Sequence, residues 1–207
     1  MNWLYLGLGA AAYLIGAIPF GHLIAKHKGV NLLQEGSGST GATNVGRLLG
    51  IQSAVVTFLL DVLKGVVVVV GTQWLTHDPT WAVANGLIAV IGHTFSPFIE
   101  FKKLRGGKGV ATTLGLLLAA QPLVGLTLFG LWGVVVVLTK YVFVASVTAA
   151  LGVIAAQIWW SIDPLPVRQI FIAIAMLAII KHVPNMVRWY RGEEKKFRFK
   201  GEKHESV

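Results

Sequence analysis

Residues 110–138 read VATTLGLLLAAQPLVGLTLFGLWGVVVVL, an apolar stretch of 29 residues interrupted at Gln121-Pro122. A transmembrane helix needs about 20 apolar residues. The stretch is therefore either one long tilted span or two short spans that turn at Gln121-Pro122. The choice decides on which side of a membrane every later segment lies.

The composition of the whole chain is that of a polytopic membrane protein. Of its 207 residues, 55% are hydrophobic and 13% are charged, whereas a soluble domain carries about 25% charged residues. The chain has no cysteine, which excludes disulfides and thiolate metal sites. Its net charge of +9 comes without a nucleic-acid-binding motif. Residues 4–25 lack a basic n-region and a cleavage site, so we interpret them as a retained span.

The distribution of basic residues favours two crossings by residues 110–138. Lys26 and Lys28 follow the first apolar segment directly, which places the N-terminus outside. A single crossing would then put the basic C-terminal end on the external face, against the positive-inside rule. Two crossings put it inside and leave Arg168 outside and Lys64 within a span. The residues of that basic end are Lys181, Arg188, Arg191, Lys195, Lys196, Arg198, Lys200 and Lys203.

We therefore expect an all-α polytopic membrane protein with seven transmembrane helices, the N-terminus outside and the C-terminus cytoplasmic. The other spans are predicted at residues 3–25, 51–75, 81–99, 142–160 and 168–183. The fourth span has only about a dozen residues. We expect a single domain over residues 1–194 and a basic cytoplasmic tail over 195–207. Three polar, glycine-bearing segments then fall together on the cytoplasmic face, where we expect the chemistry.

The first of these segments is GSGSTGATNVGR at residues 36–47. Its glycines permit backbone conformations that direct successive N–H groups at an anion, and Arg47 provides a planar fork suited to phosphate or carboxylate. A flexible polar loop is the alternative. The conjunction of Thr43, Asn44 and Arg47 at the mouth of a span favours a binding site.

The second segment, RGGKGVATT at residues 105–113, precedes an apolar helix predicted to begin near Val110. Free N–H groups and the helix dipole favour an anion there, and Lys108 adds a positive charge. The segment is not a Walker A loop, because Lys108 is followed by glycine. Phosphate binding without nucleotide hydrolysis is one interpretation, and a membrane-edge turn with a basic topology signal is the other.

The third segment, KHVPNMVRWYRGEE at residues 181–194, follows the last span. His182, Asn185 and Arg188 recur every three residues, so a helix would hold them on one face. Pro184 disfavours helix at the preceding residue and predicts a break or a new helix start there. Residues 195–203 are predicted to contact anionic lipid.

Four further residues are weaker candidates. Asp61 and Lys64 lie three residues apart within the second span, where charges are costly unless paired, so we expect a structural ion pair. His93 is either a base or a structural donor. Ser146 lies a little over one turn into the sixth span, close enough to line a cytoplasmic pocket.

The three segments, in this order, resemble the three motifs of the bacterial acyl-phosphate:glycerol-3-phosphate acyltransferases. Residues 36–47 match the first motif, G-S-G-N-x-G-A-T-N-x-x-R, except that Ser39 replaces its asparagine. In the second motif the gap before the glycines is lengthened by Lys103-Leu104-Arg105. The matching residues of the second and third motifs are Gly92, His93, Pro97, Phe101, Gly106 to Thr112, Lys181, His182, Asn185, Arg188, Gly192 and Glu194. The segments GAIPFG (16–21), DVLKG (61–65) and KYVFVAS (140–146) also resemble the family, so the resemblance covers nearly the whole chain.

The resemblance implies acyl transfer from an acyl phosphate to the 1-hydroxyl of sn-glycerol 3-phosphate. The products are lysophosphatidate and inorganic phosphate, in phospholipid biosynthesis. The family does not use acyl-CoA or acyl carrier protein, and this chain has no His-x-x-x-x-Asp pair, which other acyltransferases use. The resemblance implies no cofactor and no metal, and it implies the bacterial inner membrane, with an active site facing the cytoplasm. We expect membrane lipid but no nucleic acid as a partner, and a monomer.

We assign Lys108 and the glycines around it to the head of the acyl phosphate. Ser37, Arg47 and Asn185 are assigned to glycerol 3-phosphate. His182 is assigned there too and is the candidate base, with His93 as the second candidate. The alternative base is a substrate phosphate, whose second pKa of about 6 suits proton transfer near neutral pH. The other candidate substrate-binding residues are Gly38, Thr43, Asn44, Gly106, Gly107, Gly109, Ser146, Lys181, Arg188 and Glu194.

Two other functions fit parts of the pattern. A transporter of a small phosphorylated or anionic metabolite would also need cationic residues near membrane helices. It would, however, need polar groups near mid-membrane, and the chain shows no obvious internal repeat of the kind many transporters carry. A different transferase with a lipid-phosphate donor would keep the phosphate sites and differ in its tail pocket and acceptor.

Overall fold

The computed structural model describes residues 3–99 and 105–197, and within them nine helices and no strand occur. The prediction of an all-α protein is therefore confirmed. Phe101, Lys103, Leu104 and the tail beyond residue 197 lie outside the described residues. The helices are α1 (Trp3–Ala17), α2 (Phe20–His27), α3 (Ala42–Leu49), α4 (Ile51–Thr76), α5 (Pro79–Thr94), α6 (Val110–Ala120), α7 (Pro122–Thr139), α8 (Val142–Trp159) and α9 (Leu165–Tyr190).

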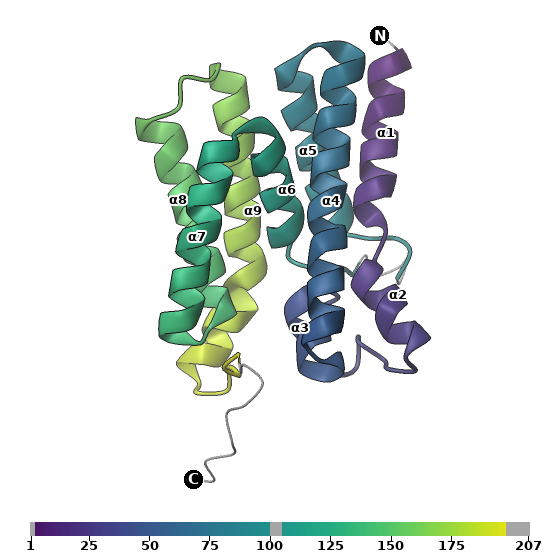
Figure 1. Ribbon diagram of the computed structural model, residues 1–207, viewed down its shortest axis with the longest axis vertical. Coiled ribbons are helices and arrows are strands. Elements are labelled where there is room, and N and C mark those ends of the chain that lie inside the picture. Colours follow the sequence, from purple (N-terminus) through teal and green to yellow (C-terminus); the bar gives the residue numbers. More distant parts are fainter. Residues whose placement is uncertain (1–2, 100–104, 198–207) are drawn as a thin grey trace.

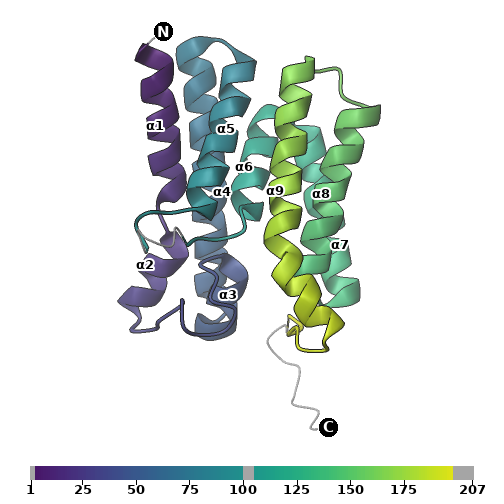
Figure 2. The same cartoon turned by 180° about the vertical axis from the view of Figure 1, so that it is seen from behind.

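The long helices form two groups joined by the short helix α6. Helices α1, α4 and α5 make one group and α7, α8 and α9 the other, with α6 between them (Figures 1 and 2). Helix α6 packs on α4 and contacts α5 and α7, while α9 packs on α8 and α5. Helices α2 and α3 and the last turns of α9 lie at the lower end in Figure 1, here called the motif end.

The stretch at residues 110–138 is two helices, as the charge distribution predicted. Helix α6 ends at Ala120, and α7 begins at Pro122, where the fixed φ of proline suits the first position of a helix. With only 11 residues, α6 is shorter than a bilayer is thick. In the part of the chain that the structure describes, five segments are long and apolar enough to cross a membrane: Trp3–His27, Ile51–Thr76, Pro122–Thr139, Val142–Trp159 and Leu165–Tyr190.

The first apolar segment is not one continuous helix. Helix α1 ends at Ala17 because Pro19 disfavours helix at Ile18, and the chain resumes as α2. The buried ammonium of Lys64 donates to the carbonyl oxygens of Gly16 (3.1 Å) and Ile18 (2.9 Å), which the break leaves without helical partners. The same ammonium lies 2.8 Å from Asp61 Oδ1, so the predicted ion pair is confirmed.

The predicted break near Pro184 is wrong. Helix α9 continues through Pro184 to Tyr190. Packing on α8 and α5 supports α9, and side-chain bonds from Asn185 and Arg188 to Glu194 hold its last turns. These tertiary contacts outweigh the local preference of proline, so His182, Asn185 and Arg188 do share one helix face.

The closest approach between α4 and α6 depends on two glycines. A Cβ at Gly65 would collide with the carbonyl oxygen of Thr112, and a Cβ at Gly115 would collide with that of Val62. Small residues let membrane helices approach until their backbones touch. This contact fixes the position along the axis of α4 at which the N-terminus of α6 lies. It therefore also fixes the position of Lys108, which precedes α6.

We expect Gly65→Ala to lower the free energy of unfolding by about 1–3 kcal/mol, because the added methyl group overpacks a backbone contact. Gly71→Ala in the same helix is the matched control, because nothing described lies within 4 Å of a Cβ at Gly71. Alanine in a helix interior is favoured over glycine by about 0.5–1 kcal/mol, so the control should be neutral or stabilising. Thermal unfolding in detergent measures both. Equal midpoints for the two variants would contradict this account of the α4–α6 contact.

Candidate active site

A cavity of about 460 Å³ lies at the motif end between the two groups of helices. Its polar part contains Ser37, Ser39, Thr43, Asn44, Arg47, Asp61, His93, Lys108, Ser146, His182, Asn185 and Glu194. Its apolar wall is formed by Ile51, Val55 and Phe58 of α4 and by Phe129, Trp132 and Val137 of α7. One end of the cavity thus suits an anion, and the wall beside it suits a hydrocarbon chain.

Glu194 is the centre of the polar part, and its side chain is only 3% exposed. Its carboxylate accepts hydrogen bonds from Asn185 Nδ2 (2.9 Å) and Arg188 Nε (2.8 Å). The guanidinium of Arg47 lies 3.5 Å from the same carboxylate and donates to the carbonyl oxygen of Lys195 at 2.9 Å. The carboxylate therefore joins α3 to the last turns of α9. It also neutralises part of the positive charge of Arg47 and Arg188.

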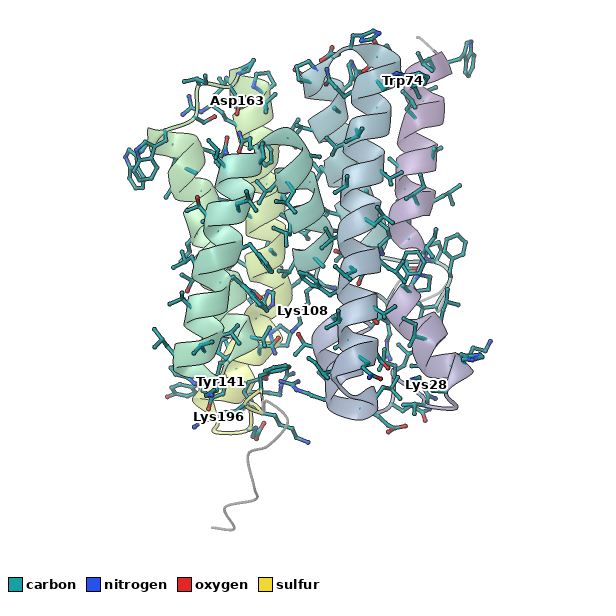
Figure 3. All side chains as sticks on the ribbon, viewed as in Figure 1. Lys28, Trp74, Lys108, Tyr141, Asp163 and Lys196 are labelled. Atoms are coloured by element: carbon teal, nitrogen blue, oxygen red, sulfur yellow. The ribbon has the colours of Figure 1, made fainter. Side chains whose placement is uncertain are left out.

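Lys108 lies just before α6 and reaches across to α9. Its ammonium donates to Asn185 Oδ1, and Figure 3 places it between the two groups of helices, away from Asp163 and Trp74 at the opposite end. Burial is the main cause that lowers the pKa of Lys108 to about 8. Glu194 opposes this shift, and three neighbouring cations add to it: Arg188, Arg47 and Lys181.

For the acyl transfer expected from the sequence, we expect kcat/KM to fall as the pH rises above about 8. The ammonium of Lys108 is present below its pKa of about 8 and is lost above it. A bound phosphate favours the charged form, so the fall in kcat should lie at higher pH than the fall in kcat/KM. Lys108→Arg keeps its charge throughout and should remove this alkaline limb. Steady-state rates between about pH 6.5 and 9.5 measure the effect. If the fall in rate at alkaline pH persists in Lys108→Arg, the titration of a group other than Lys108 causes it.

The glycines before α6 shape the loop that carries Lys108. Gly107 donates its N–H to the carbonyl oxygen of His93 (3.1 Å), and a Cβ at Gly107 would collide with the His93 ring. A Cβ at Gly106 would collide with the same carbonyl oxygen. Gly109 caps α6 with φ +79°, a conformation that favours glycine. Lys108 and Gly109 line the cavity, whereas Gly106 and Gly107 are not among its lining residues.

His93 belongs to a buried cluster with Asp61 and Lys64. Its Nδ1 lies 3.0 Å from the ammonium of Lys64 and 3.5 Å from Asp61 Oδ1. Since an ammonium only donates, Nδ1 accepts, and the other ring nitrogen faces Gly107. The ring is thus held between Lys64 and the glycine loop, which favours a structural role over that of a base.

The first polar segment folds around Asn44, which is 1% exposed. Its carboxamide accepts from the N–H of Ser37 (2.9 Å) and donates to the carbonyl oxygens of Ser39 (3.0 Å) and Glu35 (3.2 Å). Asn44 therefore holds the loop, and Ser37, Thr43 and Arg47 line the cavity around it. Gly38 forms a turn with φ +68° and is not among the lining residues. The second half of this segment is the helix α3, which the glycine pattern did not predict.

His182 lines the cavity from α9 and is 3% exposed. Its Nδ1 lies 2.7 Å from the carbonyl oxygen of Ala178. Since a carbonyl only accepts, Nδ1 carries the proton, and Nε2 of the neutral ring holds a lone pair. Among the described residues no hydrogen-bond partner of Nε2 is recorded, so this nitrogen is available to a substrate in the cavity.

Two other predicted residues have different surroundings. Ser146 lines the cavity, accepts from Trp132 Nε1 (3.2 Å) and donates to the carbonyl oxygen of Val142 (2.9 Å). The ammonium of Lys181 lies over the ring of Phe95, 4.8 Å from its centroid, and Lys181 is not among the lining residues.

Sequence reasoning missed several lining residues. Asp61 was expected only as half of an ion pair, and no role was predicted for the aromatic residues of the wall. A signal did exist, because Phe129, Trp132 and Val136 recur at helical spacing and so share one face of α7.

The fold and the cavity together define a class, a multi-pass membrane protein whose cavity, at one end of its helices, suits an anionic, amphiphilic molecule. The chain belongs to the glycerol-3-phosphate acyltransferase family, whose model matches residues 6–192. A glycerol-3-phosphate acyltransferase of Synechococcus elongatus is 40% identical over 198 residues, covering 91% of this chain and 92% of that protein. One of Aquifex aeolicus is 41% identical over 189 residues, covering 90% and 95%.

Two crystal structures of PlsY (YgiH), an integral membrane glycerol 3-phosphate acyltransferase, have the same fold. The glycerol 3-phosphate form superposes with a TM-score of 0.86 at 38% identity, covering 94% of this chain and 96% of that one. The lysophosphatidic acid form gives a TM-score of 0.83 at 37% identity, covering 94% and 95%. The prediction of an integral membrane acyltransferase is confirmed, and the alternative of a transporter is left without support.

Proposed function

We propose that the protein transfers the acyl group of an acyl phosphate to the 1-hydroxyl of sn-glycerol 3-phosphate and releases lysophosphatidate and inorganic phosphate. The observation that supports this most is the cavity in which Arg47 and Lys108 lie near the carboxylate of Glu194 beside an apolar wall, while Arg188 binds the same carboxylate from outside the cavity lining. The similar PlsY structures are described as forms with glycerol 3-phosphate and lysophosphatidic acid. Two phosphates must be held close together, and cations with N–H donors reduce the repulsion between them.

The reaction needs no covalent enzyme intermediate, because an acyl phosphate is already an activated anhydride. The hydroxyl oxygen attacks the carbonyl carbon, and an ester bond forms as the bond from that carbon to the phosphate oxygen breaks. The phosphate leaves with the electron pair, and Lys108 stabilises its charge. The hydroxyl proton goes to Nε2 of His182, or to a substrate phosphate if that is the base.

The acyl chain would follow the apolar wall between α4 and α7. Val55 on α4 is 47% exposed and Val137 on α7 is 57% exposed, although both line the cavity. Side chains that face both the cavity and the outside mark an opening toward the bilayer. A lipid-like donor could therefore enter laterally while its phosphate reaches Lys108.

The proposed orientation of the protein in the membrane rests on the distribution of its basic residues. We infer seven helical passes, with α1 and α2 counted as one and the shorter helices α5 and α6 included, so that the N- and C-termini lie on opposite sides of the membrane. The basic residues at the motif end favour the cytoplasm for that end under the positive-inside rule. We infer a single domain over residues 1–194 with a basic tail over 195–207. We also infer a monomer in the bacterial inner membrane, with its active site facing the cytoplasm.

The function is tested by incubating the purified, detergent-solubilised protein with glycerol 3-phosphate and either palmitoyl phosphate or palmitoyl-CoA. Lysophosphatidate is measured by mass spectrometry. Product from the acyl phosphate alone is expected. Product from the thioester would overturn the donor assignment. Folded protein that makes no product from either donor would contradict the proposed function.

A further inference from the structure

A second, smaller cavity of about 60 Å³ lies next to the first. The two cavities share five lining residues: Phe58, Val110, Phe129, Trp132 and Ser146. These residues form a partition between the large cavity at the motif end and a small one among α6, α7, α8 and α9. Phe58, Phe129 and Trp132 also belong to the apolar wall, so a chain bound along that wall would contact the partition.

Three aromatic rings make up most of the partition. Phe58 of α4 stacks on Phe129 of α7 with ring centroids 5.9 Å apart, and Phe129 stacks on Trp132 with centroids 6.0 Å apart. We call these three residues the ring row. The row runs from α4 to α7 at the level where the two cavities meet.

The ring row is fixed at one end by a hydrogen bond. Trp132 donates its indole N–H to Ser146 Oγ at 3.2 Å, and Ser146 donates in turn to the carbonyl oxygen of Val142. The indole of Trp132 is half-buried, and such a partner favours one orientation of the ring. Phe129, in the middle of the row, is 41% exposed, so the row is oriented at its Trp132 end.

The space beyond the ring row is apolar and lined partly by small residues. Leu117, Leu128 and Val153 contribute to it, together with Ala150 and Ala178. It has the chemistry of a hydrocarbon site, and only the rings and their immediate neighbours separate it from the larger cavity.

We propose that the ring row sets the acyl chain length of the donor. This inference rests on the proposed function, since it takes the acyl chain as the occupant of the apolar wall. Carbons that fit between Lys108 and the row are held by protein, and further carbons meet its rings. Removing a ring should join the two cavities and extend the site toward Ala150.

The test compares acyl phosphates of 12 to 20 carbons in competition, with Trp132→Ala and Phe129→Leu as variants. Both should shift the preferred chain to greater length, by about fourfold in relative kcat/KM for each methylene that enters the joined cavity. Ala150→Leu in the Trp132→Ala background should refill the space and reverse the shift. Leu126→Ala is the control, because this α7 side chain is 59% exposed and lines neither cavity.

The outcomes separate this inference from the function on which it rests. A wild-type protein without acyl-phosphate-dependent product would contradict the proposed function itself. An active wild type with the same chain-length profile in Trp132→Ala, Phe129→Leu and Leu126→Ala would overturn the role of the ring row. That result would mean that the chain leaves through the opening between α4 and α7 before it meets the rings.

Discussion

Lys108→Met is expected to lower kcat/KM for acyl transfer about 10²–10³-fold while leaving the fold intact. The ammonium donates to Asn185 and lies in the cavity that Arg47 and Glu194 also line. Removing one preorganised donor to a developing negative charge typically costs about 10²–10³ in kcat. Methionine preserves the length and apolar stem of lysine, so the change removes mainly the charge and the donors.

Lys108→Arg distinguishes loss of charge from loss of geometry. It keeps the positive charge but replaces a compact ammonium by a planar fork, so its activity should lie between the wild type and Lys108→Met. Initial rates over both substrates, with thermal midpoints as the folding control, give the comparison. A folded Lys108→Met protein with nearly wild-type kcat/KM would show that Lys108 does not stabilise the leaving phosphate.

The features that the sequence predicted well depend on the local preference of a single residue or on charge summed over a whole segment. The turn at Gln121-Pro122 follows from proline and from charge summed over the basic C-terminal end. The convergence of Arg47, Lys108, His182 and Asn185 on one cavity follows from placing the three polar segments at the same end of the helices. Both inferences needed only the side of the membrane on which a segment lies.

The features that the sequence did not predict depend on contacts between distant residues. Pro184 predicted a break, but packing on α8 and α5 and the bonds to Glu194 keep α9 continuous. Asn44 lines the cavity and stays a predicted substrate-binding residue, but the sequence did not predict that its carboxamide would also bond to the loop around it. The hydrogen-bond partner of a polar side chain depends on which groups lie near it in the folded protein. Residue type and spacing along the sequence do not give that information.

The role of the glycines in the second segment also depends on contacts that the sequence does not show. Their pattern predicted backbone N–H groups directed at a phosphate, yet Gly107 donates to the carbonyl oxygen of His93. Gly106 and Gly107 are present because no Cβ fits between the loop and α5. They act on the site indirectly, by setting where Lys108 leaves the loop.

His182→Gln is expected to lower kcat about 10²–10⁴-fold, the range that general-base catalysis supplies, with little change in KM for glycerol 3-phosphate. The Nδ1–H of His182 is held by the carbonyl oxygen of Ala178, which leaves Nε2 as the acceptor toward the cavity. Glutamine can hydrogen-bond to substrate but cannot take its proton near neutral pH. A loss in kcat alone therefore identifies proton transfer rather than binding.

The competing hypothesis makes the opposite prediction for the same variant. If a substrate phosphate is the base, His182 serves only to orient glycerol 3-phosphate, and His182→Gln should raise KM while kcat stays within about tenfold of the wild type. Val183→Ala, at an exposed position of the same helix, controls for general effects on α9. Rates measured with acyl phosphate saturating and glycerol 3-phosphate varied separate the two cases. A rise in KM with kcat preserved would remove His182 as the base and assign proton transfer to the substrate.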